Sequence, residues 1–590
     1  MAVDSQRLTT HPLYLLRTIG DKVKSTQCIK VIRSAMLVSL AALSGAASWA
    51  ARDFTPQAGT WVINQEVDGK PGRGLAIDVQ GNTFFMQVFG YEKNGDATFY
   101  TATGHMDGTA VTAPLMRYQG GRSFGSEARD AKEDANLGNV TVSFTSGLKG
   151  TVQFPGEPAV EIRRFLVDSA MEGVTNPVMQ NGTRLMTMLV LNAQREVAFQ
   201  WMAELSRSRD NRTELTMHQH GYNPRGYGGT IFQKLVCEPD GLRSRFTCLP
   251  SGSEPVLGFD GKPAEGPNIA RLNFELAGYD LSGFVDLAGA GESQPVTTLQ
   301  LTGFDQFSSI KGSTRVVDGK LITPYTQQNY YPDGNEFGPG ACSLQCSARE
   351  NFNTLMPING TWVVEDELTG KPGRGLALDI QGSTAILQIF NYRPDGQPSF
   401  HMGSADYVSK GADTLATVAT IPMDEYANGR SIGGVQQPAQ WRSHAGDALL
   451  EFAYQKFNAQ PQEEWQYWTS GLVQLPGEQP VRIRRLQLER AETWPEEFLG
   501  QWFLPALQTS FTLSKIEGNA AVSEDGLASC RPPVTGSADN QVSCIVRLGD
   551  GASWNRDSPK PLMNRGGAMI RLRDRHGNGV GLGQLDWAKD

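Results

Sequence analysis

Short runs of alternating apolar and polar positions, separated by glycine-rich turns, dominate this chain. In the segment 73–80, Leu75, Ile77 and Val79 form one apolar face, and the residues between them form the other. An alternation of period two is typical of a β-strand with one buried face. The pattern therefore predicts a strand here, preceded by a turn at 68–72.

The next segment, 83–92, is apolar on both faces. Phe84, Met86 and Val88 point one way, and Phe85, Gln87, Phe89 and Tyr91 point the other. A strand with two apolar faces is covered on both sides. We therefore expect it to be central, with a barrel interior on one side and a neighbouring module on the other.

Similar runs continue downstream, and Asn94-Gly95 between two of them is a strong hairpin signal. Sequential hairpins of this length make an antiparallel meander, and eight strands can close into a small barrel. The strands expected in this unit are 61–67, 73–80, 83–92, 97–105, 110–118, 139–145, 151–154 and 160–167.

The stretch Gly59–Phe99 occurs again as Gly360–Phe400, a gapless offset of 301 positions (360 minus 59). A fixed period of this kind marks a duplicated unit. The offset grows to 321 by Ile483, which matches Ile162, so the second copy carries about 20 extra residues beyond Phe400. We name this repeated unit module A.

A second, weakly repeated unit, module B, follows each A. The prediction is an all-β protein of tandem duplicated small antiparallel β-barrels or sandwiches in the order A-B-A-B. The length of 590 residues has room for about four such domains. The expected boundaries are 1–50 leader, 51–168 module A1, 169–306 module B1, 307–352 linker, 353–490 module A2 and 491–590 module B2.

The first fifty residues resemble an export signal. Basic residues precede an apolar run, 35–47, and Ser48-Trp49-Ala50 fits a cleavage site. The alternatives are a buried helix or a membrane anchor; the run is short for a span, so no transmembrane anchor is expected after processing. Its removal takes the net charge from −9 to −13 (47 minus 60). This acidic balance disfavours nucleic acid and anionic membranes as partners.

Six cysteines remain after Cys28 leaves with the leader, and an even number in an exported chain indicates disulfides. Local spacing favours three short loops. The rival, a zinc site, needs clustered cysteine and histidine ligands that this sequence does not show. No metal or other cofactor is expected. The predicted pairs are Cys237–Cys248, Cys342–Cys346 and Cys530–Cys544.

Module A opens on Gly59, Trp61 and Glu66, and continues through Gly72, Gly74, Gln80-Gly81 and Phe89-x-Tyr91. This pattern resembles a repeat of uncharacterised exported proteins of beta- and gammaproteobacteria, and the G-x-W opening is similar to that of lipocalins and avidins. The resemblance covers the two A modules and implies an exported β module. It brings no activity with it.

The five residues from Gly121 to Gly125, and those from Gly429 to Gly433, match G-x-S-x-G. The hydrolase elbow places this motif between a strand and a helix. Here it lies in a glycine-rich β loop, so we interpret it as a tight turn.

The candidate ligand-binding residues recur in both copies, as polar groups inside a barrel or as satisfied residues near turns. They are Asp78, Gln80, Gln87, Asp379, Gln381 and Gln388. Trp61 and Trp362 are expected to be structural and to close the base of each module.

The leading hypothesis is a periplasmic or extracellular, non-enzymatic protein of binding or structural type. Its partner would be a small molecule or a cell-envelope protein. The alternative is an exported hydrolase acting on a polymer or a lipid. A filled barrel interior would favour a structural role, and an open apolar cavity would favour binding.

Overall fold

The computed structural model describes most of the repeated units. The described residues are 54–167, 183–193, 196–207, 210, 212–219, 231–239, 245–252, 266–277, 280–289, 296–308, 315–317, 320–322, 357–381, 384–410, 416–453, 470–488, 495–504, 509–531, 543–546, 569–574 and 584–585. Their regular structure is almost entirely β, with short 3-10 turns at Asn64–Glu66, Glu365–Glu367 and Glu496–Phe498. The all-β prediction is confirmed. Within these ranges, no helix has the length and apolar character needed to cross a bilayer.

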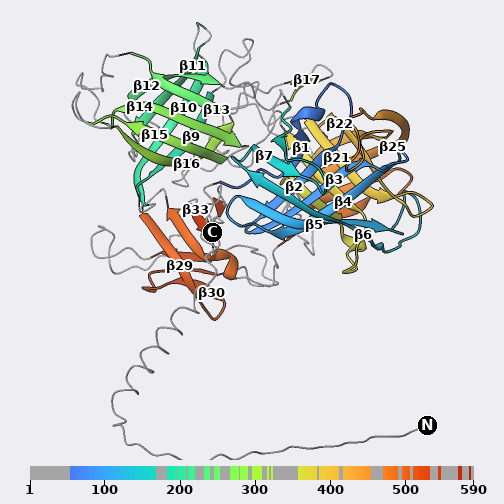
Figure 1. Ribbon diagram of the computed structural model, residues 1–590. Coiled ribbons are helices and arrows are strands. Elements are labelled where there is room, and N and C mark those ends of the chain that lie inside the picture. Colours follow the sequence, from blue (N-terminus) through green and yellow to red (C-terminus); the bar gives the residue numbers. More distant parts are fainter. Residues whose placement is uncertain are drawn as a thin grey trace, which may run out of the picture. The chain divides into compact units, whose positions relative to one another are not determined.

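Module A1 is a closed barrel in which each strand pairs with the next and the last pairs with the first (Figure 1). The predicted meander is confirmed, with two main differences in strand bounds. The first strand ends at Ile63 and not at 67, because the chain turns there into a 3-10 helix, Asn64–Glu66. β6 begins seven residues earlier than expected (139 minus 132), because the β5–β6 hairpin is longer than expected and the added part of β6 is mostly exposed. The strands are β1 Gly59–Ile63, β2 Gly74–Gln80, β3 Thr83–Tyr91, β4 Ala97–His105, β5 Ala110–Gln119, β6 Lys132–Phe144, β7 Lys149–Gln153 and β8 Val160–Arg164.

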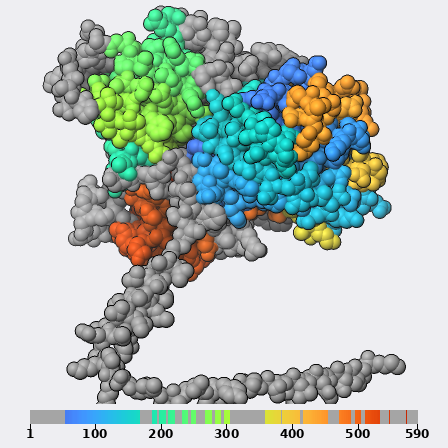
Figure 2. All heavy atoms as spheres, viewed as in Figure 1, coloured from blue at the N-terminus to red at the C-terminus, as the bar shows by residue number. Residues whose placement is uncertain are grey.

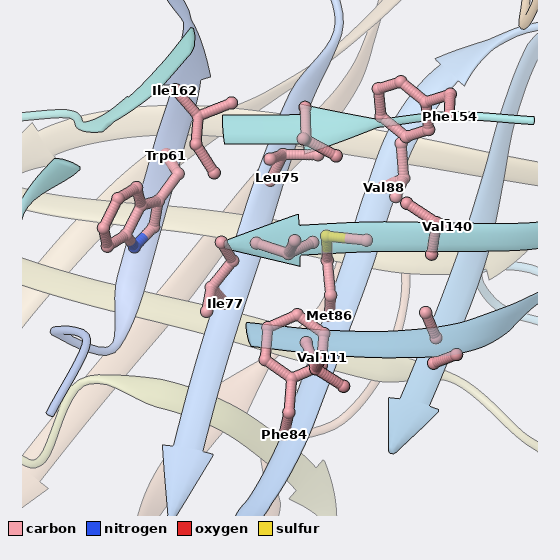
Figure 3. Packing of buried hydrophobic residues seen from close by; sticks show 14 of the residues in the cluster. Trp61, Leu75, Ile77, Phe84, Met86, Val88, Val111, Val140, Phe154 and Ile162 are labelled. Atoms are coloured by element: carbon pink, nitrogen blue, oxygen red, sulfur yellow. The ribbon is translucent and has the colours of Figure 1, made fainter. Parts of the chain in front are cut away.

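Apolar side chains fill the interior of this barrel (Figure 3). Trp61 is fully buried, its Nε1 donates to the Gln57 carbonyl oxygen at 2.9 Å, and its ring meets Phe144 edge-on at 5.4 Å. Leu75 and Ile77 lie on the inward face of β2, as the alternation predicts. An eight-stranded barrel has an interior that side chains just fill, and this one is filled.

Module A2 repeats this plan, and its sheet closes through an additional pairing between β22 and β24. Its first strands keep the register of A1: Trp362 lies opposite Leu376 as Trp61 lies opposite Leu75. Trp362 is also fully buried and donates to the Ile358 carbonyl oxygen at 2.9 Å. The strands are β19 Gly360–Val364, β20 Gly375–Gln381, β21 Thr384–Tyr392, β22 Pro398–Asp406, β23 Val408–Ser409, β24 Ala416–Ala427, β25 Gln440–Ala453, β26 Ser470–Gln474 and β27 Val481–Arg485.

Module B1 forms a second eight-stranded closed barrel, drawn in green in Figure 2 as a body of closely packed atoms. The predicted disulfide Cys237–Cys248 joins directly opposed residues of β12 and β13. Its strands are β9 Thr183–Leu191, β10 Val197–Arg207, β11 Thr213–Gln219, β12 Ile231–Pro239, β13 Arg245–Pro250, β14 Ile269–Ala277, β15 Asp280–Leu287 and β16 Thr297–Ser308.

The segment between the halves contains one described hairpin, β17 Arg315–Val317 with β18 Lys320–Ile322. The expected pair Cys342–Cys346 lies outside the described residues.

Module B2 is a seven-stranded sheet with the predicted disulfide Cys530–Cys544 between β31 and β32. Trp502 repeats the arrangement of the A modules, because its Nε1 donates to the carbonyl oxygen of Phe498, four residues earlier, at 2.8 Å. The strands are β28 Gly500–Leu504, β29 Thr509–Glu517, β30 Ala520–Ser523, β31 Ala528–Arg531, β32 Ser543–Val546, β33 Met569–Asp574 and β34 Gln584–Leu585.

Candidate functional site between the A modules

The outer faces of β3 and β4 in A1 pack against the outer faces of β22 and β21 in A2. The ring centroids of Phe89 and Phe400 are 5.5 Å apart, and those of Phe99 and Phe390 are 5.6 Å apart. Phe390 and Phe400 lie 301 positions after Phe89 and Phe99. The second contact is therefore the first one with the two modules exchanged. The two copies therefore meet as the subunits of a twofold dimer do. The expectation that β3 is covered on both sides is confirmed.

Two buried ion pairs flank this aromatic layer. Arg164 Nη2 lies 2.6 Å from Asp379 Oδ1, and Arg485 Nη2 lies 2.6 Å from Asp78 Oδ1. All four side chains are at least nine-tenths buried. Each carboxylate also accepts a backbone N–H of the other module at 2.9 Å, from Thr60 or Thr361. The Nε atoms of Arg164 and Arg485 are buried without a partner among the described residues, but every carboxylate oxygen is hydrogen-bonded, which helps to make a buried pair tolerable.

Of the two placements left open for Asp78, Gln80, Asp379 and Gln381, the barrel interior is not the one that the structure shows. Side chains alternate along a strand, so the inward positions of Ile77 and Val79 send Asp78 and Gln80 outward, toward the other module. Gln80 Nε2 donates to the Leu486 carbonyl oxygen, and Gln381 Nε2 donates to that of Phe165, both at 2.8 Å. These groups join the modules through protein partners, and their role toward a ligand stays a prediction.

The two G-x-S-x-G segments, 121–125 and 429–433, are turns that reach the opposite module, and we call them the arms. The Ser126 N–H donates to the Ser123 carbonyl oxygen, and the Gly434 N–H donates to that of Ser431, as in a tight turn. Glycine is required at the start of each arm: a Cβ on Gly121 would lie 2.1 Å from the Tyr392 ring, and one on Gly429 would lie 2.1 Å from that of Tyr91.

Each arm carries one apolar side chain to the core of the opposite barrel. Phe124 packs against the A2 core, and Ile432 packs against the A1 core. Phe124 also lies 4.7 Å from the buried His401 ring. Burial lowers the pKa of His401 to about 4, so its ring is neutral at pH 7.

An arginine of the A2 arm completes a buried charge cluster in A1. Arg73 pairs with Glu66 at 2.7 Å and with Glu157 at 2.8 Å, and Arg430 lies 3.2 and 3.1 Å from the same two carboxylates. The Gly433 N–H donates to Glu157 Oε1 at 2.6 Å. Burial favours a raised pKa for Glu157, but the hydrogen bonds from Arg73 and Gly433 outweigh it and hold that pKa below its ordinary value.

The same cluster recurs in A2. Arg374 pairs with Glu367 and, at 2.6 Å, with Glu478, and Arg122 of the A1 arm lies 2.8 and 3.3 Å from these carboxylates. The Gly125 N–H donates to Glu478 Oε1 at 2.9 Å. Here too burial is outweighed by hydrogen bonds, from Arg374 and Gly125, and the pKa of Glu478 is lowered. The two modules thus clasp one another through reciprocal arms.

A pocket of about 270 Å³ opens at this contact and is lined by both modules. Its A1 wall includes Phe85, Gln87 and Thr101, and its A2 wall includes Tyr392. The Gln87 Oε1 and Tyr392 Oη atoms are buried and have no hydrogen-bond partner among the described residues. At the equivalent place in A2, Gln388 Oε1 is likewise without a partner among the described residues, and its Nε2 donates to Thr60 Oγ1 at 2.9 Å. Of the predicted ligand-binding residues, Gln87 is the one that lines this pocket.

The sequence analysis did not identify the arginines and glutamates of the two charge clusters between the modules. Arg122 recurs as Arg430, and Glu157 recurs as Glu478 within a shared Pro-Gly-Glu. The recurrence of a charged residue in both copies was the available signal, since a solvent-exposed turn does not require it.

No protein-family model matches this chain, and no curated protein sequence does. Among solved structures, the crystal structure of the Helicobacter pylori beta clamp in complex with carprofen aligns at 8% identity and a TM-score of 0.08, over 71% of this chain and 92% of that one. A similarity of this size supports no inference about fold or function.

Proposed function

We propose that this chain is an exported, non-enzymatic binding protein whose ligand site lies where modules A1 and A2 meet. The observation that supports it is the pocket at this contact, which residues of both modules line. Small-molecule sites are concave, mainly apolar and supplied with a few polar groups.

The interiors of the A barrels determine where the proposed site can lie. In both A modules the interior is filled by apolar side chains, which taken alone favours a structural role. The concave surface that favours binding lies between the barrels. The arms and ion pairs hold the two walls of the pocket in a fixed relation, which lowers the entropic cost of binding.

The two disulfides support a site of action outside the reducing cytosol, in the periplasm or beyond the cell. The leader at 1–50 belongs to the same proposal.

Native mass spectrometry of the protein purified from its own host tests the proposal. We expect a small molecule bound at one per chain, and we expect Thr101→Met, which adds bulk to the pocket wall, to remove it. The matched control is Met402→Thr at the equivalent position of A2, which should leave the mass unchanged. A chain that carries no molecule, or one whose molecule survives Thr101→Met, would contradict the proposed site. Capture of a cell-envelope protein in its place would assign the function to another surface.

A further inference from the structure

We propose that protonation of His401 releases the A1 arm, residues 121–125, from module A2 in mild acid, while the A2 arm, residues 429–433, stays bound to A1. The inference concerns the contact between the modules and does not depend on a ligand in the pocket.

The A1 arm covers a buried imidazole. His401 lies on β22 and is 8% exposed, and its Nδ1 lies 3.1 Å from Asn391 Oδ1. Its ring centroid is 4.7 Å from that of Phe124, the arm residue that packs against the A2 core. A charge on His401 would therefore lie out of water while the arm is bound, which is costly.

One carboxylate, Glu425 of β24, favours the protonation of His401. That carboxylate already accepts a hydrogen bond from Ser399 at 3.3 Å and lies 3.6 Å from Arg442 of β25. Burial outweighs its attraction and lowers the pKa of His401 to about 4, from an ordinary value of 6.5. Release of the arm returns the ring to water, so the released form binds the proton first as the pH falls.

The other neighbours of the imidazole keep their charge in mild acid. Asn391 of β21 is neutral, and Arg122 of the arm is paired with carboxylates of A2. Burial favours a raised pKa for Glu478, which anchors the arm, but the hydrogen bonds from Arg374 and Gly125 outweigh it and lower that pKa. The Glu478 anchor therefore stays ionised at pH 5, and a release between pH 7 and 5 is assigned to His401.

The equivalent place in A1 holds a tyrosine. Tyr100 stands 301 positions before His401 (401 minus 100), and it belongs to the core against which Ile432 of the A2 arm packs. Burial raises the pKa of Tyr100, so its phenol is neutral throughout the acid range. The two arms are thus held in the same way, by an apolar side chain and a glutamate, and they differ in the group beneath the apolar side chain.

The difference between the two pKa values of His401 sets the size of the effect. With a pKa of about 4 in the bound form and 6.5 in the released form, the ratio of released to bound A1 arm should rise about 20-fold between pH 7 and pH 5. The A2 arm should show no such rise.

Amide hydrogen exchange of the full chain, read by mass spectrometry on peptides that contain the two arms, measures this release. Two matched amides report on it: the Gly125 N–H donates to Glu478 Oε1, and the Gly433 N–H donates to Glu157 Oε1. The pH changes the intrinsic exchange rates of both amides alike, so the ratio of their protection isolates the difference between the arms. From pH 7 to pH 5 we expect the protection of Gly125 to fall about 20-fold relative to that of Gly433.

His401→Gln removes the titrating ring and keeps a polar side chain beside Asn391, so it should abolish this relative fall. The matched control His444→Gln removes an exposed histidine of the same module and should leave the fall unchanged. Equal changes in both arms of the parent chain, or a relative fall that persists in His401→Gln, would overturn the inference. The comparison of the two arms within the parent chain needs no variant, so it decides the question even where a far-ultraviolet circular dichroism spectrum shows that His401→Gln misfolds.

Discussion

Replacing Asp379 by alanine should unfold the contact between the A modules selectively. The substitution leaves the Arg164 guanidinium, which is fully buried, without its counter-charge. Arg164 Nη1 would keep only the carbonyl oxygens of Thr60 and Phe165 as partners. The Thr60 N–H would lose its acceptor as well.

The expected loss is about 3–5 kcal/mol, the usual cost of removing one partner of a buried ion pair. The double variant Arg164→Met, Asp379→Leu removes both charges and should recover most of this loss, because a buried pair often has little net value over apolar residues of similar size. Asp78→Ala leaves Arg485 without its counter-charge and repeats the test at the equivalent pair. It should lower the free energy of unfolding by a similar amount.

Native-state hydrogen exchange, read by mass spectrometry on peptides of residues 59–91 and 360–392, measures this loss within the A modules and apart from the B modules. The matched control is Asp130→Ala, which removes the exposed partner of Lys371 and should cost far less, because solvent screens an exposed ion pair. A loss below about 1 kcal/mol for Asp379→Ala, or one no larger than the control, would refute the reasoning.

The other predictions concern single features of the chain. Trp61→Ala should cost about 3–5 kcal/mol by urea denaturation, because it empties the base of a filled barrel; a loss under about 1 kcal/mol would make the tryptophan a surface contact. The pKa of His401 is about 4 in the folded state and 6.5 in the unfolded state, so the unfolded chain binds the proton first as the pH falls. The free energy of unfolding therefore decreases as the pH drops from 6.5 toward 4, by about 3 kcal/mol in total. His401→Phe should remove this part of the pH dependence, and identical urea midpoints for variant and parent across pH 7 to 4.5 would count against it. Cys237→Ala with Cys248→Ala should lower stability by about 3 kcal/mol, measured by exchange in β12 and β13; no change would mean that the loop is already ordered without the bond. Amino-terminal sequencing of exported protein should begin at or near Ala51, and a retained Met1 would contradict the leader.

The strands and their faces could be predicted because they depend on local sequence. The alternation of Leu75, Ile77 and Val79 specifies which side of β2 is inward, and the apolar Phe89 and Tyr91 specify that the outer face of β3 is covered. The cysteine pairs of the B modules follow from spacing within one hairpin.

The partner of each outward group could not be predicted in the same way. Asp78 and Arg485 are separated by 407 positions, and no periodicity relates them. The polar character of Asp78 therefore favoured a barrel interior or a place near a turn, and it did not indicate a contact with the other module. Phe124 appeared as one residue of a turn, and only the structure shows that it packs against the core of the other barrel.

Zero-length carbodiimide cross-linking of the native chain tests most directly whether A1 and A2 clasp one another. The reagent joins an amine to a carboxylate only where the two touch, with loss of water. Lys371 of A2 and Asp130 of A1 meet at 3.0 Å on the surface, and Lys410 and Glu451 meet at 2.9 Å within A2. We predict that peptide mapping of the monomeric product finds both links, Lys371–Asp130 and Lys410–Glu451. A monomer that contains the link within A2 but not the one between the modules would contradict the account.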